Sequence, residues 1–196
     1  MSIPVAREKP LRSDAQRNRE RIVAVAREVF AEHGLDAPVE EIARAAEVGV
    51  GTLYRRFPAK EDLIDAVFEE TLGELATIAR AALAAETGWE GFCTFVERVV
   101  ELNAANRGLH GLMGSQEHGR ARIEAIRRRM RPLVGRLISR AQAEGTLRPD
   151  FKGEDMRMVF AAAGRVIELT HGDARQWRRF VAYLLAGLRV QREEDA

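Results

Sequence analysis

The chain has 196 residues, of which 46% are hydrophobic and 31% charged, a composition typical of soluble globular proteins. Its formal net charge of +1 provides no global attraction to nucleic acid, so any such contact must come from local clustering of basic residues. Cys93 is the single cysteine, which excludes an intrachain disulfide, and no apolar run approaches the ~18 residues of a membrane span. The start of the chain lacks the apolar core of a signal peptide, so we expect a cytoplasmic protein without membrane contact.

Short helices joined by tight turns are predicted for the first part of the chain. Residues 1–12 are predicted to form a flexible tail, and Ser13 with Gln16 has the spacing of a capping box that would open the first helix. Apolar residues at helical spacing predict the buried face of this helix: Ile22, Ala26, Val29 and Phe30. Gly34 is predicted to end it, and Pro38 suits the first turn of a second helix. The second helix would bury four small or apolar side chains: Val39, Ile42, Ala43 and Ala46.

The stretch 38–57 is predicted to form a helix-turn-helix motif. A turn at Val48 and Gly49 separates the second helix from a third, in which Leu53 and Phe57 would face the core. The polar and cationic residues of the third helix would face outward: Thr52, Tyr54, Arg55 and Arg56. An apolar back with a cationic front is the layout of a helix that enters a DNA groove, which makes the chain a candidate DNA-binding protein.

Helical periodicity continues towards the C-terminus, without the alternation typical of strands. Pro58 would break the third helix, and residues 59–84 are predicted to form a long connecting helix. Further apolar stripes predict helices across 92–103, 123–141, 156–167 and 177–188. The predicted fold is therefore all-α, with a three-helix N-terminal domain at 13–58 and a C-terminal helical bundle at 85–192.

Three consecutive segments resemble the DNA-binding domain of TetR-family transcriptional regulators: RIVAVAREVFAEHG, EEIARAAEVGVGTLYRRF and PAKEDL. The resemblance extends over about residues 17–75, which is roughly a third of the chain. Two positions depart from the family pattern, because Glu47 stands where glycine is common in the turn and Gly49 stands where serine often caps the recognition helix. Glycine is a tolerable helix cap. Ala37 and Pro38 replace a frequent threonine that often touches phosphate, so the resemblance implies one phosphate contact fewer.

The resemblance implies a set of DNA-binding residues in and around the third helix. Tyr54, Arg56 and Lys60 would contact phosphate, and residues 50–55 would read base edges. The full predicted set is Arg44, Gly49, Val50, Gly51, Thr52, Tyr54, Arg55, Arg56 and Lys60. Arginine suits both roles, because its guanidinium is a rigid cationic fork that binds phosphate or the O6 and N7 atoms of guanine. A place in the core stays open as the alternative for Tyr54, and a solvated surface position as the alternative for Arg44.

By the same resemblance, the C-terminal bundle would hold a small-molecule effector. The candidate pocket residues are mostly apolar: Phe92, Phe95, Val96, Val99, Asn103, His110, Met113, Met130, Val134, Leu137 and Phe160. Asn103 and His110 would be the polar handles, and such a lining suits a hydrophobic or aromatic molecule. For each apolar residue of the set, an ordinary core position is the alternative interpretation.

The resemblance also implies a homodimer, because the last two helices of each subunit pair in this family. We carry that interface to residues 154–170 and 174–192. The predicted interface residues are Ala163, Gly164, Ile167, Phe180, Leu184 and Gly187. Glycine inside a helix costs up to ~1 kcal/mol relative to alanine, so close helix approach is a physical reason for Gly164 and Gly187. Packing within one subunit is the alternative.

The combined prediction is a ligand-responsive transcriptional regulator, in its simplest form a repressor, that binds a palindromic double-stranded DNA operator as a homodimer. An effector would release it, and a helical adaptor that uses the same domain for protein contacts is the alternative function. No enzyme and no cofactor are predicted, because no catalytic triad or phosphate loop occurs. A metal site is not predicted either, since Cys93, His110, Glu117 and His118 match no standard ligand spacing. The basic run over 120–140 is predicted to be a solvated or ion-paired face.

Overall fold

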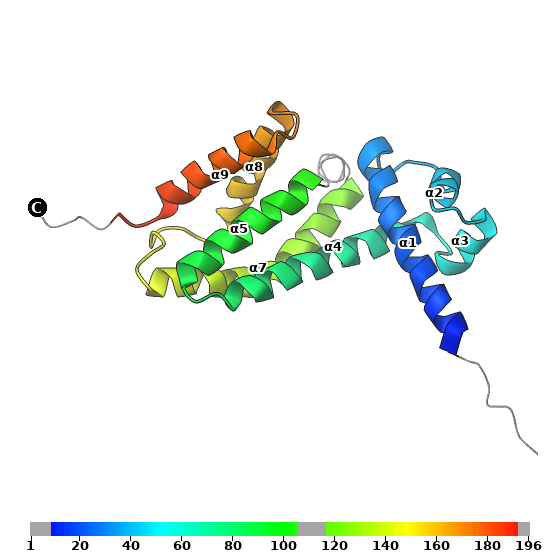
Figure 1. The fold of residues 1–196 in the computed structure, drawn as a ribbon, viewed down its shortest axis with the longest axis horizontal. Coiled ribbons are helices and arrows are strands. Elements are labelled where there is room, and N and C mark those ends of the chain that lie inside the picture. The colour runs from blue at the N-terminus through cyan, green and yellow to red at the C-terminus, as the bar shows by residue number, and fades with distance from the viewer. Residues whose placement is uncertain (1–8, 106–116, 192–196) are drawn as a thin grey trace, which may run out of the picture. The chain divides into compact units, whose positions relative to one another are not determined.

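The computed structural model describes residues 9–105 and 117–191, and the chain divides after Glu69 into two compact units (Figure 1). Every regular element in the described residues is a helix, which confirms the predicted all-α fold. The first unit contains α1 (Lys9–His33), α2 (Val39–Ala45), α3 (Val50–Arg56) and the beginning of α4 (Lys60–Leu83). The second unit contains the rest of α4 together with α5 (Gly88–Ala105), α7 (Glu117–Ala143), α8 (Met156–Leu169) and α9 (Ala174–Leu188).

The first unit is built on the apolar faces of α1 and α2. The side chains predicted to face inward from these two helices are all buried: Ile22, Ala26, Val29, Phe30, Val39, Ile42, Ala43 and Ala46. Gly34 follows α1 with a φ of 91°, a conformation that glycine adopts without steric cost. Its N–H donates to the carbonyl of Phe30 at 3.1 Å. The predicted end of the first helix at Gly34 is therefore confirmed.

The first helix starts earlier than its sequence pattern indicates. α1 begins at Lys9, so the predicted opening at Ser13 is wrong. The spacing of a capping box also occurs inside helices, where polar pairs three or four residues apart stabilise the helix surface. The side chain of Gln16 donates to Glu20 at 2.8 Å, one turn further along the helix. A local pattern of polar residues cannot by itself distinguish these two uses.

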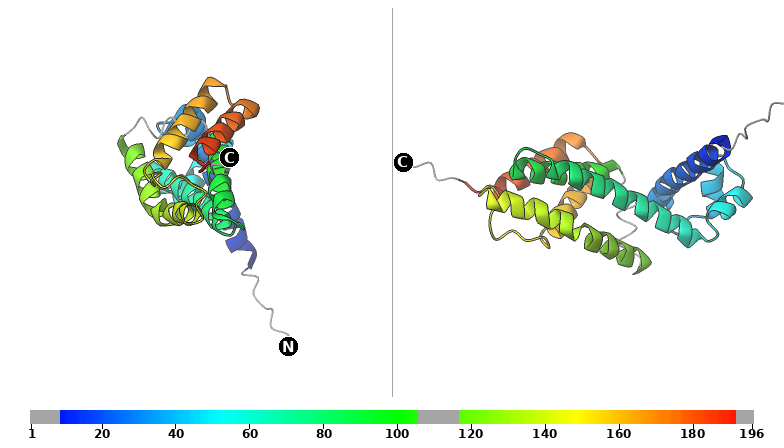
Figure 2. Two further views of the ribbon diagram at one scale, coloured as in Figure 1. Left: turned by 90° about the vertical axis from the view of Figure 1, so that its left-hand side faces the viewer. Right: turned by 90° about the horizontal axis from the view of Figure 1, so that it is seen from below.

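In the second unit, α5 packs against α7, α8 and α9 (Figure 2). Its apolar face is buried: Phe92, Phe95, Val96, Val99 and Val100. The ring of Phe92 meets Phe151 edge to face with centroids 5.6 Å apart, and Phe95 meets Phe160 in the same way at 6.2 Å. These aromatic contacts fix α5 against α8 and the segment that precedes it.

The last helix ends earlier than predicted. α9 stops at Leu188, and the following residue, Arg189, is extended and forms an isolated β-bridge with Leu147. The N–H of Arg148 donates to the carbonyl of Leu188, and the N–H of Val190 donates to a carbonyl of the loop after α7, both at 3.0 Å. This pairing replaces the hydrogen bonds of another helical turn. Because it joins segments about 40 residues apart, helical periodicity gives no sign of it.

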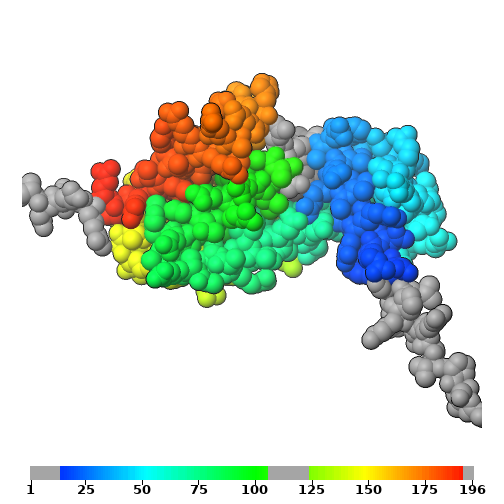
Figure 3. Space-filling view, viewed as in Figure 1, coloured from blue at the N-terminus to red at the C-terminus, as the bar shows by residue number. Residues whose placement is uncertain are grey.

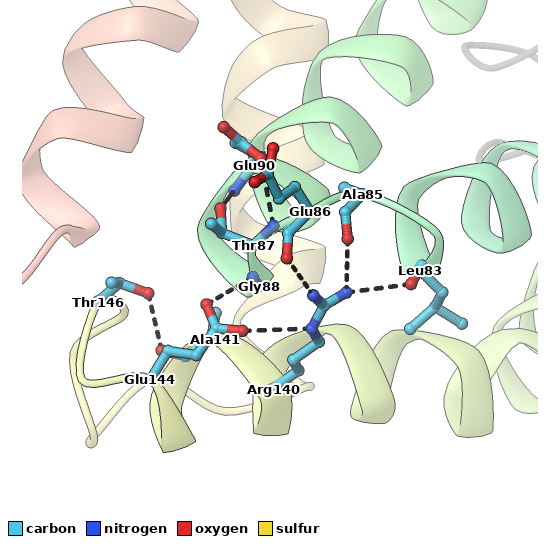
Figure 4. Close-up of polar contacts among 10 residues, drawn as sticks. All are labelled: Leu83, Ala85, Glu86, Thr87, Gly88, Glu90, Arg140, Ala141, Glu144 and Thr146. Atoms are coloured by element: carbon cyan, nitrogen blue, oxygen red, sulfur yellow. Dashed lines mark hydrogen bonds and ion pairs between the residues drawn. The ribbon is translucent and has the colours of Figure 1, made fainter.

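A network around Arg140 ties the end of α4 to α7 (Figure 4). The Arg140 guanidinium donates to three backbone carbonyls, those of Leu83 at 3.1 Å, Ala85 at 2.9 Å and Glu86 at 2.7 Å. Its Nε–H also donates to the carboxylate of Glu144 at 3.2 Å. Carbonyls at a helix C-terminus lack intrahelical partners, and a cationic donor satisfies them here. The prediction of a solvated or ion-paired face was therefore incomplete for Arg140.

The first turn of α5 is held by the same network and by its own cap (Figure 4). The carboxylate of Glu144 accepts a hydrogen bond from the N–H of Gly88 at 2.5 Å. Thr87 and Glu90 form a reciprocal capping box, with both hydrogen bonds at 3.2 Å. Gly88 has no room for a side chain, since a Cβ there would lie 2.7 Å from the backbone nitrogen of Ala141. The start of α5 is thus closely packed against α7.

Candidate nucleic-acid interface

Two buried side chains anchor α3. Leu53 exposes 1% and Phe57 exposes 3% of its surface, as predicted for the inward face of this helix. The guanidinium of Arg19, on α1, lies over the Phe57 ring at 5.5 Å from its centroid. This cation–π contact joins α1 to the end of α3. Sequence reasoning missed this role for Arg19, because a pair of residues 38 positions apart leaves no local signal.

The turn between α2 and α3 has the hydrogen bonds of a Schellman motif. The N–H of Val48 donates to the carbonyl of Ala43 at 2.9 Å, and the N–H of Glu47 donates to that of Arg44 at 3.1 Å. Glu47 occupies the position that this motif places in the left-handed region, and its φ is 53°. Glycine is favoured there because it has no Cβ, which explains why glycine is the residue expected at the position of Glu47.

Gly49 begins α3 without a side-chain cap. Its backbone is extended, and its carbonyl accepts hydrogen bonds from the N–H groups of Thr52 at 2.8 Å and Leu53 at 3.1 Å. A serine in this position would add a side-chain acceptor for one of the free N–H groups of the first turn. The first turn of α3 therefore presents backbone N–H groups that no side chain of Gly49 can satisfy.

The remaining face of α3 is open to solvent; Figure 3 shows the surface of α2 and α3 in cyan. Arg55 and Arg56 are exposed, and Tyr54 exposes 43% of its surface, so a purely core role does not describe this tyrosine. Thr52 is half-buried, and its hydroxyl oxygen accepts a hydrogen bond from Nη2 of Arg55 at 2.8 Å. Gly51 is exposed, and among the described residues a Cβ at this position would have no atom within 4 Å apart from the local helix backbone.

The other predicted DNA-binding residues flank this face in the sequence. Arg44 is exposed in the last turn of α2, Val50 is half-buried at the start of α3, and Lys60 is half-buried at the start of α4. The carboxylate of Asp62 accepts a hydrogen bond from the N–H of Ala59 at 2.9 Å and so satisfies one donor at the start of α4. Exposed cations and a phenol on one short helix can contact a polyanion by charge and by hydrogen bonding.

Comparison with known proteins places both parts of the chain in one family. Residues 22–67 match the family described as bacterial regulatory proteins, tetR family, and residues 89–190 match the C-terminal domain of SbtR-like transcriptional regulators. The crystal structure of the TetR transcription regulatory protein from Mycobacterium vanbaalenii is 34% identical, with a TM-score of 0.67, over 92% of this chain and 100% of that one. The chain belongs to the TetR family of transcriptional regulators.

Two further relatives agree with this assignment. The TetR transcriptional regulator SCO0520 from Streptomyces coelicolor is 31% identical over 89% of this chain and 99% of that one, with a TM-score of 0.61. An HTH-type transcriptional regulator of Staphylococcus aureus (strain USA300) is 40% identical over 63 residues, 32% of this chain. That match spans only about a third (34%) of the length of the staphylococcal protein. The predicted resemblance to the TetR family is confirmed.

The pocket residues predicted for this TetR-family chain lie mostly in the core of the second unit. Six of them are buried: Phe92, Phe95, Val96, Val99, Met130 and Leu137. Asn103, Val134 and Phe160 are half-buried, whereas His110 and Met113 lie outside the described residues. These six buried side chains therefore pack as ordinary core residues. An effector that reached them would have to separate them.

Open grooves occur elsewhere on the second unit. One, of about 410 Å³, lies between α5 and α9 and is lined by Trp89, Cys93, Glu97 and Arg189 among others. Burial raises the pKa of the Cys93 thiol to about 12, and the charge of Glu97 raises it further than Arg189 lowers it. The thiol is therefore protonated at neutral pH.

No group of metal-ligating side chains occurs in the described residues, and none of the helices described is long and apolar enough to cross a bilayer.

The predicted dimer residues of this TetR-family chain divide into two groups. Ala163 and Ile167 are buried in the core of the second unit, exposing 1% and 2% of their surface. Phe180 and Leu184 are half-buried. Among the described residues, no atom from outside the local helix backbone lies within 4 Å of a Cβ built on Gly164 or Gly187. Close helix approach within the subunit therefore does not explain these glycines. Large apolar side chains are also exposed on the same two helices: Met158, Leu169 and Tyr183.

Proposed function

We propose that the chain is a repressor that binds a palindromic operator as a homodimer in the cytoplasm, with α3 in the major groove of each half-site. The exposed cationic face of α3 carries this proposal. Leu53 and Phe57 anchor the helix in the core, and Tyr54, Arg55 and Arg56 are exposed and can contact DNA. In a two-fold dimer, the two copies of α3 would meet half-sites about 34–36 Å apart, one turn of DNA.

The exposed faces of α8 and α9 support the dimer. Gly164 and Gly187 leave open space above their backbones, and Met158 and Tyr183 each expose 63% of their surface. Small residues and largely exposed apolar side chains are suited to contact with a second copy. Gly187→Glu is expected to raise the dimer dissociation constant, because it places a charge in the interface without a clash in the subunit. Sedimentation equilibrium measures the effect, with Gly73→Ala, at an exposed position of α4, as the control.

We propose further that a small apolar effector binds between α5 and α7 and lowers operator affinity. The apolar character of Phe95, Val96 and Leu137 supports this choice of effector class. The coupling between effector and operator is expected to be about 1–3 kcal/mol, the usual range for such systems. A compound that binds the second unit and leaves operator affinity unchanged would contradict the coupling.

Selection of bound duplexes from a random DNA pool at physiological salt tests the proposed function. A palindrome with half-sites about one helical turn apart is the expected product. The operator obtained is then titrated with Arg56→Ala over a series of salt concentrations. This variant is expected to bind all sequences more weakly and to reduce the slope of log K against log salt by about one charge. Absence of any selected sequence from ligand-free protein would overturn the proposal.

A further inference from the structure

We infer that Arg55 reads a single guanine in each half-site and that Thr52 positions its guanidinium for this contact. The inference rests on the proposed function and assigns different DNA contacts to different residues of α3. It assigns the base contact to Arg55 and leaves the backbone contacts to Tyr54 and Arg56.

The position of Arg55 on the helix separates it from the other exposed residues. At about 100° per residue, Arg55 lies roughly 160° from both buried anchors, Leu53 and Phe57, and so projects opposite the core. Tyr54 and Arg56 each lie only about 60° from one of these anchors, on opposite flanks of α3. When a helix enters the major groove, its outermost side chains meet base edges and its flanks meet the two phosphate backbones.

The hydrogen bond to Thr52 directs the guanidinium of Arg55. Nη2 of Arg55 donates to the Thr52 hydroxyl at 2.8 Å, and Thr52 lies one turn closer to the start of α3. This end of a recognition helix is the one that contacts base edges. The bond uses one of the five guanidinium N–H groups, so a pair of donors remains for the O6 and N7 atoms of guanine. Arg56 has no such bond among those found in the described residues, which leaves it free to follow a phosphate.

Gly51 gives independent support to close approach at this face. By helical spacing it lies beside Arg55, opposite the buried anchors. Glycine weakens a helix, and the space around Gly51 would admit a side chain, since no described atom from outside the local helix backbone lies within 4 Å of its Cβ position. The fold itself therefore does not require glycine here. A base edge or backbone of DNA at this face would require it.

The test compares wild-type protein with four variants on the selected operator and on operators changed at one base pair at a time. Arg55→Ala is expected to lose roughly 5- to 150-fold of discrimination at one guanine and to keep its preferences elsewhere. Arg55→Lys keeps the charge but not the planar fork, so it is expected to lose the same discrimination with an unchanged salt slope. Thr52→Val is expected to lose roughly 2- to 10-fold at the same base pair, and Thr52→Ser to restore it.

A double variant separates positioning by Thr52 from a direct contact. Thr52→Val combined with Arg55→Ala is expected to match Arg55→Ala alone at that guanine, because Thr52 acts there only through Arg55. An additional loss in the double variant would overturn the positioning role. Uniform weakening by Arg55→Ala on all sequences, with a salt slope reduced by about one charge and normal binding by Arg55→Lys, would identify a phosphate contact and overturn the inference alone. Failure of the wild type to select any sequence would overturn both this inference and the proposed function.

Discussion

Removal of the Arg140 side chain is expected to destabilise the second unit by about 2–4 kcal/mol. The variant Arg140→Ala deletes three hydrogen bonds to the carbonyls of Leu83, Ala85 and Glu86, and it frees Glu144 from its cationic partner. Hydrogen bonds from charged donors contribute about 1.5–3 kcal/mol each when buried. The Arg140 side chain is 35% exposed, so water can replace part of each bond, and we count about 1 kcal/mol per carbonyl.

Tryptophan fluorescence in a urea titration measures this loss of stability in the second unit. The two tryptophans, Trp89 and Trp177, both lie in the second unit, so their signal follows its unfolding. Arg136→Ala is the matched control, because Arg136 is exposed on the same helix one turn away and its removal is expected to change stability by less than about 0.5 kcal/mol. Protein concentration is held constant, since association would otherwise change the apparent stability. Equal midpoints for Arg140→Ala and Arg136→Ala would refute the role of the network.

Three further outcomes are expected. Gly91→Ala should destabilise the second unit by about 1–3 kcal/mol in the same titration, because the new Cβ would lie 2.4 Å from the Ala82 carbonyl oxygen. Gly73→Ala, at a position with open space, should instead stabilise the unit by up to about 1 kcal/mol. Glu47→Gly should raise the thermal midpoint of the first unit, followed by circular dichroism, through a gain of about 0.5–1 kcal/mol, and a lower midpoint would show that the left-handed turn is not strained. Cys93 should react with iodoacetamide at pH 8.5 at least roughly tenfold more slowly in folded than in unfolded protein, since its folded pKa of about 12 keeps the thiol protonated; equal rates would contradict the burial.

Features with a local cause could be predicted from the sequence. The helical period located the buried faces of α1 and α2, and Gly34 marked the end of α1. The two departures from the family pattern, Glu47 and Gly49, fall at a left-handed turn residue and at an uncapped helix start, where the type of residue affects the local backbone. The same helical period predicted the outward face of α3. It did not predict the hydrogen bond between Arg55 and Thr52 within that helix.

Features that join distant parts of the chain could not be predicted. Arg140 bonds to carbonyls 54 to 57 residues earlier, and Arg19 lies over the ring of Phe57. A helical pattern shows only that such arginines face away from their own apolar stripe. Which backbone or ring they meet depends on how the helices pack, and this information is absent from any short window of sequence. The pairing of Leu147 with Arg189 could not be predicted for the same reason, because it also joins residues far apart in the sequence.

The dense packing of α5 sets how sensitively any interior effector could act. Phe95 and Leu137 expose 3% and 1% of their surface, so a molecule that reaches them must bind a minor form in which they have separated. If that form makes up about 1% of the population, the apparent dissociation constant is about a hundred times the intrinsic one. Trimming a neighbouring core side chain, as in Val96→Ala, would then lower stability and increase effector affinity together. The effector concentration needed for release from DNA would thus depend on the stability of the protein core as well as on the contacts between protein and effector.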